Sequence, residues 1–207
     1  MTLVSAPEDG RGKVVGAGIR IAWLGGEAGQ LSEPLGVGIG VRIRLRPPAG
    51  PFLGEIAVEH DRFARALPVE VELEDERGAP TGETIVLHRS QRLALTRMLV
   101  GVAWSPAWRR VQPKLGVSGG AALAFFLHPG AEPISVSRWK GLVRTEAALA
   151  VRVYRQVWGE IAVEYNVLLP DATETFDLRD AGGRPGPMPI RPFGNYAAAT
   201  ANVLYSF

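Results

Sequence analysis

The chain has 207 residues, the size of one ordinary domain, and 46% of them are apolar against 21% charged. Lysine and arginine (23) nearly balance aspartate and glutamate (21), which excludes a disordered chain and a basic tail that binds nucleic acid. Cysteine is absent, so a disulfide framework, a thiolate metal site and a cysteine nucleophile are excluded as well.

The beginning of the chain and its apolar runs carry no signal for a membrane helix. The longest apolar run, Ala121 to Leu127, is far shorter than the ~18 residues that such a helix needs. Glu8 and Asp9 stand where a cleavable signal peptide would be apolar. We therefore expect no signal peptide in this chain and interpret it as a mature protein with an added Met.

Alternation with a period of two predicts eight strands, and the segment from Leu35 to Arg46 shows it best. Apolar side chains fill its odd positions, whereas glycine and arginine fill its even positions, so the two sets lie on opposite faces of a strand. The same pattern predicts further strands at 15–23, 55–61, 85–104, 114–125, 144–153, 160–167 and 196–207. Within 85–104 the apolar positions change phase between Leu95 and Met98, where we expect a β-bulge.

The composition of the polar face indicates that it lines the inside of a barrel. It is rich in glycine, alanine and serine, which suits the narrow interior of eight strands, and its charges nearly balance. Because buried charges need partners, we predict a structural network of ion pairs in the lumen. Its members would be Arg20, Arg42, Arg44, Arg46, Lys114, Arg144 and Arg152 with Glu55, Glu59, Asp61, Glu146, Glu160 and Glu164.

The connections between predicted strands alternate in length, as periplasmic turns and extracellular loops do in outer-membrane barrels. The short connections are 47–51, 105–110 and 155–156, and the long ones are 25–34, 64–83, 128–141 and 170–194. Prolines at 185–189 and the pair Arg191-Pro192 predict a stiff, extended last loop.

The aromatic residues gather at the two ends of the predicted strands, where membrane interfaces would lie. With both termini periplasmic, the periplasmic end holds Phe52, Trp104, Trp108, Tyr154, Trp158, Tyr205 and Phe207, and the extracellular end holds Trp23, Phe63, Phe125, Trp139, Phe193 and Tyr196. The expected fold is all-β: a closed, eight-stranded, antiparallel, up-and-down transmembrane barrel over residues 11–207, after a periplasmic segment at 1–10. A soluble barrel with its charged face outward is the alternative.

Two stretches carry a resemblance to a known group. The chain ends in Val203-Leu204-Tyr205-Ser206-Phe207, and in the strand at 111–122 a proline precedes repeated glycines. In these stretches the chain resembles the small eight-stranded outer-membrane β-barrels of the OmpA/OmpX/OmpW-like superfamily. The resemblance implies that Val203, Tyr205 and Phe207 form a C-terminal signal for the barrel-assembly machinery. It also implies a bacterial outer membrane, with the lipid bilayer, lipopolysaccharide and envelope proteins as partners.

Three functions stay open. The first is a non-enzymatic structural, adhesive or partner-docking role through the extracellular loops, including that of a subunit in a larger envelope assembly. The second is a narrow channel for small solutes, whose pore the arginines of 42–46 would line. The third is hydrolysis of lipid A in the outer leaflet, because deacylases of this barrel size use a His-x-Ser pair with a carboxylate, and His88 and Ser90 share one strand face.

The catalytic alternative lacks one partner in the sequence, since Gln91 to Ala103 contains no carboxylate to orient the imidazole. His60 and His128 have no second ligand at metal-binding spacing. We therefore expect a non-enzymatic protein with no cofactor, no metal and no nucleic-acid partner.

Overall fold

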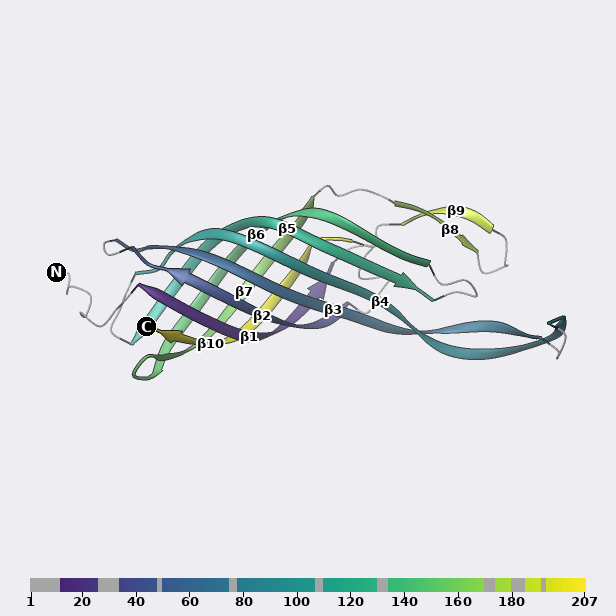
Figure 1. Ribbon diagram of the computed structural model, residues 1–207, viewed down its shortest axis with the longest axis horizontal. Helices are drawn as coiled ribbons and strands as arrows, with labels where there is room; N and C mark the ends of the chain where they lie inside the picture. The colour runs from purple at the N-terminus through teal and green to yellow at the C-terminus, as the bar shows by residue number, and fades with distance from the viewer. Residues whose placement is uncertain are drawn as a thin grey trace.

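The computed structural model describes residues 12–25, 34–47, 50–74, 78–106, 110–129, 134–169, 174–179, 185–190 and 193–207. Eight strands close into an antiparallel barrel in the order β1-β10-β7-β6-β5-β4-β3-β2, as predicted, and β8 and β9 form a separate hairpin (Figure 1). The strands are β1 (Lys13–Leu24), β2 (Leu35–Leu45), β3 (Phe52–Glu74), β4 (Pro80–Trp104), β5 (Val111–His128), β6 (Ile134–Tyr154), β7 (Val157–Leu169), β8 (Glu174–Arg179), β9 (Pro185–Ile190) and β10 (Tyr196–Ser206). None of the described residues belongs to a helix that could cross a membrane.

The two ends of the barrel differ in their connections. At one end, called the turn end here, β2 ends and β3 starts, β4 ends and β5 starts, and β6 turns into β7 at 155–156; β1 also starts and β10 ends there. At the opposite end, the loop end, β3 and β4 continue far past the barrel as a two-stranded hairpin (Figure 1). The predicted segment at 1–10, as well as Trp108, Arg191 and Pro192, lies outside the described residues.

The prediction of long loops at 64–83 and 128–141 is wrong, because strands occupy most of both segments. The barrel pairing of β3 with β2 ends at Phe63 and that of β4 with β5 at Arg92, but β3 and β4 pair with each other as far as Glu74 and Pro80. The strand character of this segment has a cause in its sequence: within 67–73, apolar residues alternate with proline and glutamate in the same period of two. β6 likewise starts at Ile134, and the segment 170–194 contains β8 and β9.

The expected bulge between Leu95 and Met98 is not found, since β3 and β4 keep one register from the turn end into the hairpin. Leu93, Leu95 and Leu99 all point into the lumen and are at most 1% exposed, whereas Met98 faces outward. The change of phase in the sequence therefore has another cause. At the loop end the lumen is filled by apolar side chains, so apolar residues occupy both faces of β4 there.

The apolar set of side chains covers the outside of the barrel, which excludes the soluble alternative. Ile19, Ile39 and Ile161 are each 65% exposed, while the charged side chains between them are buried. The glycines of β2 give the lumen its room: a Cβ at Gly36 would meet the ring of Phe63 on β3. An apolar outer wall around a polar interior is the arrangement of a transmembrane barrel.

Outward-facing aromatic side chains stand at both ends of this wall. At the turn end they are Phe52, Trp104, Tyr154, Tyr205 and Phe207, and at the loop end they are Trp23, Phe125 and Trp139. Four aromatics predicted to lie at the interfaces are instead buried, namely Phe63, Trp158, Phe193 and Tyr196. They occupy inward positions, where large rings close the lumen.

Candidate functional site

The lumen holds a charge-balanced network of buried ion pairs contributed by seven of the eight barrel strands. Six cations, Arg20, Arg42, Arg44, Arg97, Lys114 and Arg144, contact six carboxylates, Glu55, Glu59, Asp61, Glu146, Glu160 and Glu164. Each of the twelve residues is at most 7% exposed. Since the charges sum to zero, the network is neutral as a unit, which is the condition under which buried ions are tolerated.

Glu59 is the hub of the network. Its carboxylate lies 2.7 Å from Arg97 Nη2, 2.9 Å from Arg144 Nη1, 3.0 Å from Arg42 Nη2 and 3.1 Å from Arg20 Nη1. These arginines come from β4, β6, β2 and β1, so one carboxylate on β3 ties together strands on several sides of the barrel. Such shared, charge-assisted hydrogen bonds fix the side chains in place.

Two residues of the predicted network lie apart from it. Arg46 follows the end of β2 and donates from Nη1 to the Ser105 carbonyl at 2.8 Å. Arg152 is exposed at the turn end, where its guanidinium carbon lies 4.9 Å from the ring centroid of Trp158. Both stand at the turn end of their strands, beyond the stretch that the barrel wall buries.

Arg97 was missed from the sequence, although its side chain is fully buried among Glu59, Asp61 and Asn166. If the alternation of inward and outward residues is continued along β4 from the turn end without a bulge, Arg97 falls on the inward face, two residues from Leu99. The expected bulge concealed it.

Side chains close the lumen on both sides of the charged layer. At the loop end a cluster with Phe63, Leu93, Phe126, Phe193 and Tyr196 spans the interior, and at the turn end Ala150, Trp158 and Leu204 pack together. A cavity between the charged layer and β4–β5 has a volume of about 10 Å³, no more than one water requires. The described interior is thus packed with side chains.

The hairpin of β3 and β4 is amphipathic. On one face, Leu67, Val69 and Val71 lie opposite Arg89, Leu87 and Ile85; on the other, Glu70 and Glu72 are exposed. Ile85 and Leu87 remain 40% and 38% exposed, so nothing in the described chain covers the apolar face fully.

His88 and Ser90 lie on the exposed part of this hairpin, opposite Pro68 and Ala66. The register brings Glu70 diagonally across from His88 on the same face, a carboxylate that the sequence did not reveal. Within the described chain no hydrogen bond joins His88 to Ser90 or to Glu70. The pair therefore lacks the base–nucleophile contact of a hydrolase.

The other two histidines, His60 and His128, each contact a different polar side chain. His60 shares a hydrogen bond of 2.9 Å with Thr96 on the outer wall, and His128 lies 3.3 Å from Gln91 Oε1. Within the described ranges, no group of three or more His, Asp or Glu side chains could hold a metal ion.

Val203 and Tyr205 lie on one outward strip of β10, and Phe207 follows the end of the strand. Val203 is 64% exposed, and the rings of Tyr205 and Phe207 stack with centroids 6.3 Å apart. The Tyr205 hydroxyl donates to Gln156 Oε1 at 2.7 Å, which ties the strip to the turn between β6 and β7.

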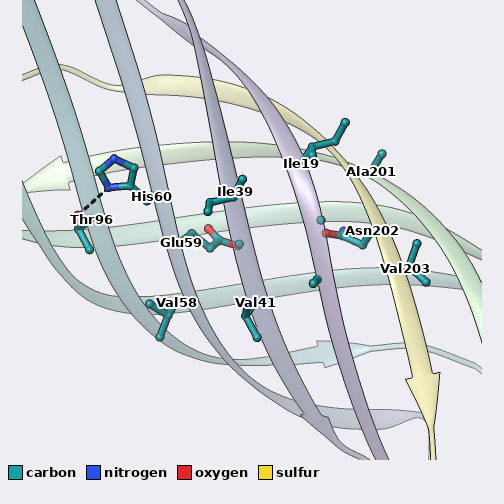
Figure 2. A pocket seen from close by; sticks show the side chains of 13 residues that line it. Ile19, Ile39, Val41, Val58, Glu59, His60, Thr96, Ala201, Asn202 and Val203 are labelled. Carbon is teal, nitrogen blue, oxygen red and sulfur yellow. Dashed lines mark hydrogen bonds between the residues drawn. The ribbon is translucent and has the colours of Figure 1, made fainter.

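An apolar groove of about 850 Å³ crosses the outer wall over β10, β1, β2, β3 and β4. Figure 2 shows Val203 and Ala201 at one end, Ile19, Ile39 and Val58 between, and the hydrogen-bonded pair His60 and Thr96 at the other end. Most of its lining side chains belong to the outward, apolar set.

These features define a transmembrane β-barrel with a side-chain-filled, charge-balanced lumen. No protein-family model and no curated protein sequence matches the chain. In structure it is similar to Neisserial surface protein A, with 13% identity and a TM-score of 0.56 over 97% of this chain and 100% of that one.

Two further solved structures are similar over nearly their whole length. Ail, the attachment invasion locus protein of Yersinia pestis, in complex with the heparin analogue sucrose octasulfate, has 11% identity and a TM-score of 0.51 over 95% of this chain and 99% of that one. A major outer membrane protein from Thermus thermophilus has 11% identity and a TM-score of 0.50 over 94% and 99%. The chain thus has the fold of small eight-stranded outer-membrane barrels, as the resemblance implied.

Proposed function

We propose that this protein is an integral barrel of a bacterial outer membrane that holds its loop end outside the cell, with both termini periplasmic. There it serves a structural, adhesive or partner-docking role and neither transports solutes nor catalyses a reaction. The observation that carries the proposal is the combination of a filled lumen with a long amphipathic hairpin beyond the barrel.

The filled lumen argues against the channel alternative. A solute would have to pass the ring cluster at the loop end and then displace ion pairs of 2.6–3.1 Å between buried groups. Breaking a buried pair costs about 3–5 kcal/mol, and several pairs would have to open together. Planar-bilayer recordings of the purified protein are expected to show no stable single-channel currents, and reproducible current steps would restore the channel.

The hairpin supports the docking role. Residues 64–74 extend about 35 Å at ~3.3 Å per residue, far enough to reach beyond the membrane surface. A two-stranded hairpin alone in water is marginally stable, and a third strand or a packed partner stabilises it. Its free edges and half-exposed apolar face suit a partner that adds a strand or packs on that face.

The orientation is tested with epitope tags at two places in otherwise unchanged chains. One tag follows Gly78 at the tip of the hairpin, and the other follows Gln156 in the short turn between β6 and β7. In intact cells an antibody is expected to label the Gly78 tag and to reach the Gln156 tag only after the outer membrane is permeabilised. The reverse labelling would place the termini outside and overturn the proposed orientation.

The role of the hairpin is tested by replacing residues 65–90 with a short turn. Cells that make the trimmed protein are compared with cells that make the full chain for adherence, for autoaggregation and for cross-linking to envelope proteins. Like the full chain, the trimmed barrel should reach the outer membrane and should migrate faster on gels without boiling than after boiling, while these interactions are lost. Unchanged interactions with the trimmed barrel would remove the hairpin from the function.

A further inference from the structure

Two arginines at the loop end of the outer wall have no partner in the described chain. Arg62 on β3 and Arg92 on β4 are exposed, and both alternate with buried inward neighbours, so they point away from the barrel. No ion pair or hydrogen bond from the described residues reaches either guanidinium. By register Arg62 lies opposite Ala94 and Arg92 opposite Ala64, which makes the two arginines diagonal neighbours on one face.

Their height on the wall matches that of a lipid headgroup. A barrel strand tilted by ~40° rises about 2.5 Å per residue along the membrane normal. Arg62 therefore stands about 25 Å above the level of Phe52, and Arg92 about 30 Å above that of Trp104, the outward aromatic pair at the turn end. The apolar band of such barrels is about 25 Å tall, so both guanidinium groups lie at its edge.

The apolar groove on the same wall ends directly below these arginines. His60, at the groove's end on β3, is the outward residue before Arg62, and Thr96 is two outward positions from Arg92 on β4. The groove is lined by the small side chains of Ala17 and Ala201 and by Ile19, Ile39 and Val58, of which Figure 2 labels all but Ala17. The wall thus offers an apolar groove of about 850 Å³ with the polar pair His60 and Thr96 at one end. Beyond that end lie Arg62 and Arg92, which form no ion pair with any described residue.

We propose that this surface is a binding site for one membrane lipid with an anionic headgroup. Arg62 and Arg92 bind the headgroup phosphate, the His60–Thr96 pair contacts the polar region beneath it, and an acyl chain lies in the groove. Guanidinium groups suit phosphate oxygens, to which they donate paired hydrogen bonds. The inference rests on the proposed function, because it requires the loop end to stand at a membrane interface.

The test measures retention of single lipids by native mass spectrometry of the folded barrel in detergent. The probes are dioleoyl phosphatidylglycerol, which is anionic, and dioleoyl phosphatidylcholine, which is zwitterionic. The wild type is expected to retain one phosphatidylglycerol in preference to phosphatidylcholine. An interfacial arginine changes affinity for an anionic surface about fivefold, so Arg62→Gln/Arg92→Gln should bind phosphatidylglycerol about 25-fold more weakly and lose the preference.

The matched control removes two arginines at the opposite end, in Arg152→Gln/Arg155→Gln, and should keep the preference. Ala17→Phe fills the groove with an apolar ring while leaving both arginines in place, and should weaken retention several-fold. Should the double variant fail to fold, the single variants Arg62→Gln and Arg92→Gln are each expected to lose about fivefold.

Equal retention of both lipids by the wild type, or equal retention of phosphatidylglycerol by the wild type and the double variant, would overturn the site. Gel mobility without boiling is recorded for every sample. If the wild type migrates as a folded barrel but shows no lipid preference, only the proposed lipid site is refuted. If the wild type never shows the folded band, the proposed function as a membrane barrel is refuted.

Discussion

The charge of Glu59 is expected to be a main source of the barrel's stability. In Glu59→Gln the side chain keeps its size, so no cavity opens, but four arginines lose a shared partner at 2.7–3.1 Å. The lumen then carries one uncompensated positive charge. This charge is costly because the site is shielded from water: the side chains of Arg97 and Glu59 are fully buried in the wild type. Removing one partner of a buried ion pair costs about 3–5 kcal/mol, and we expect a loss in that range.

The loss is measured by urea unfolding of the protein in lipid vesicles, followed by tryptophan fluorescence and by the mobility of unboiled samples on gels. The control is Glu83→Gln on the exposed hairpin, where a surface substitution should change the free energy of unfolding by no more than about 0.5 kcal/mol. If Glu59→Gln unfolds at the same urea concentration as this control, the network does not stabilise the fold through this carboxylate.

A double variant that also removes an arginine sharpens the test. Arg97 forms its ion pairs with Glu59 and Asp61, so Glu59→Gln/Arg97→Gln restores the balance of charge in the lumen. The double variant is expected to lose less stability than the sum of the two single variants, by at least about 1 kcal/mol. Strict additivity would mean that the two side chains act independently.

Other parts of the structure lead to three more predictions. Gly38→Ala places a Cβ against the carboxylate of Asp61 and the backbone of β3, and should lower the free energy of unfolding in urea by about 1–3 kcal/mol. Gly119→Ala, whose Cβ would have ordinary contacts, should leave it nearly unchanged. Cells that produce His88→Ala/Ser90→Ala should contain the same lipid A by mass spectrometry as cells that produce the wild type, and a wild-type-specific loss of acyl chains would reinstate the hydrolase. Replacing 65–90 with a short turn should leave the free energy of unfolding within about 0.5 kcal/mol of the wild type, since the removed strands pair with each other.

The sequence predicts the barrel well because one physical constraint controls most of it. Lipid requires apolar side chains on one face of every strand, so a period of two in Leu35 to Arg46 determines both the strand and its inner face. The near balance of charge on the other face likewise indicates ion pairing, since an unpaired buried charge is costly.

The constraint weakens where the lumen itself becomes apolar. Around Leu93 and Leu95 both faces carry apolar residues, the pattern loses its phase, and Arg97 is hidden with it. The hairpin was missed for a different reason. Its glutamates look like those of a solvated loop, although apolar residues alternate with them in a period of two, and pairing with β4 stabilises 64–74 as a strand.

The ion pairs across the lumen also constrain how the barrel can be built. Arg20 on β1 binds Glu164 on β7, 144 residues further along the chain, and Arg44 on β2 binds Glu160. A sheet with an open seam between β1 and β10 would separate β7 from β2, so Glu160, whose ion pairs in the described chain are with Arg42 and Arg44, would lose both partners. In hydrocarbon such an unpaired charge costs several kcal/mol. Closure of the seam and neutralisation of Glu160 are therefore one event, and a half-built sheet needs water or another protein beside this carboxylate until the last strand arrives.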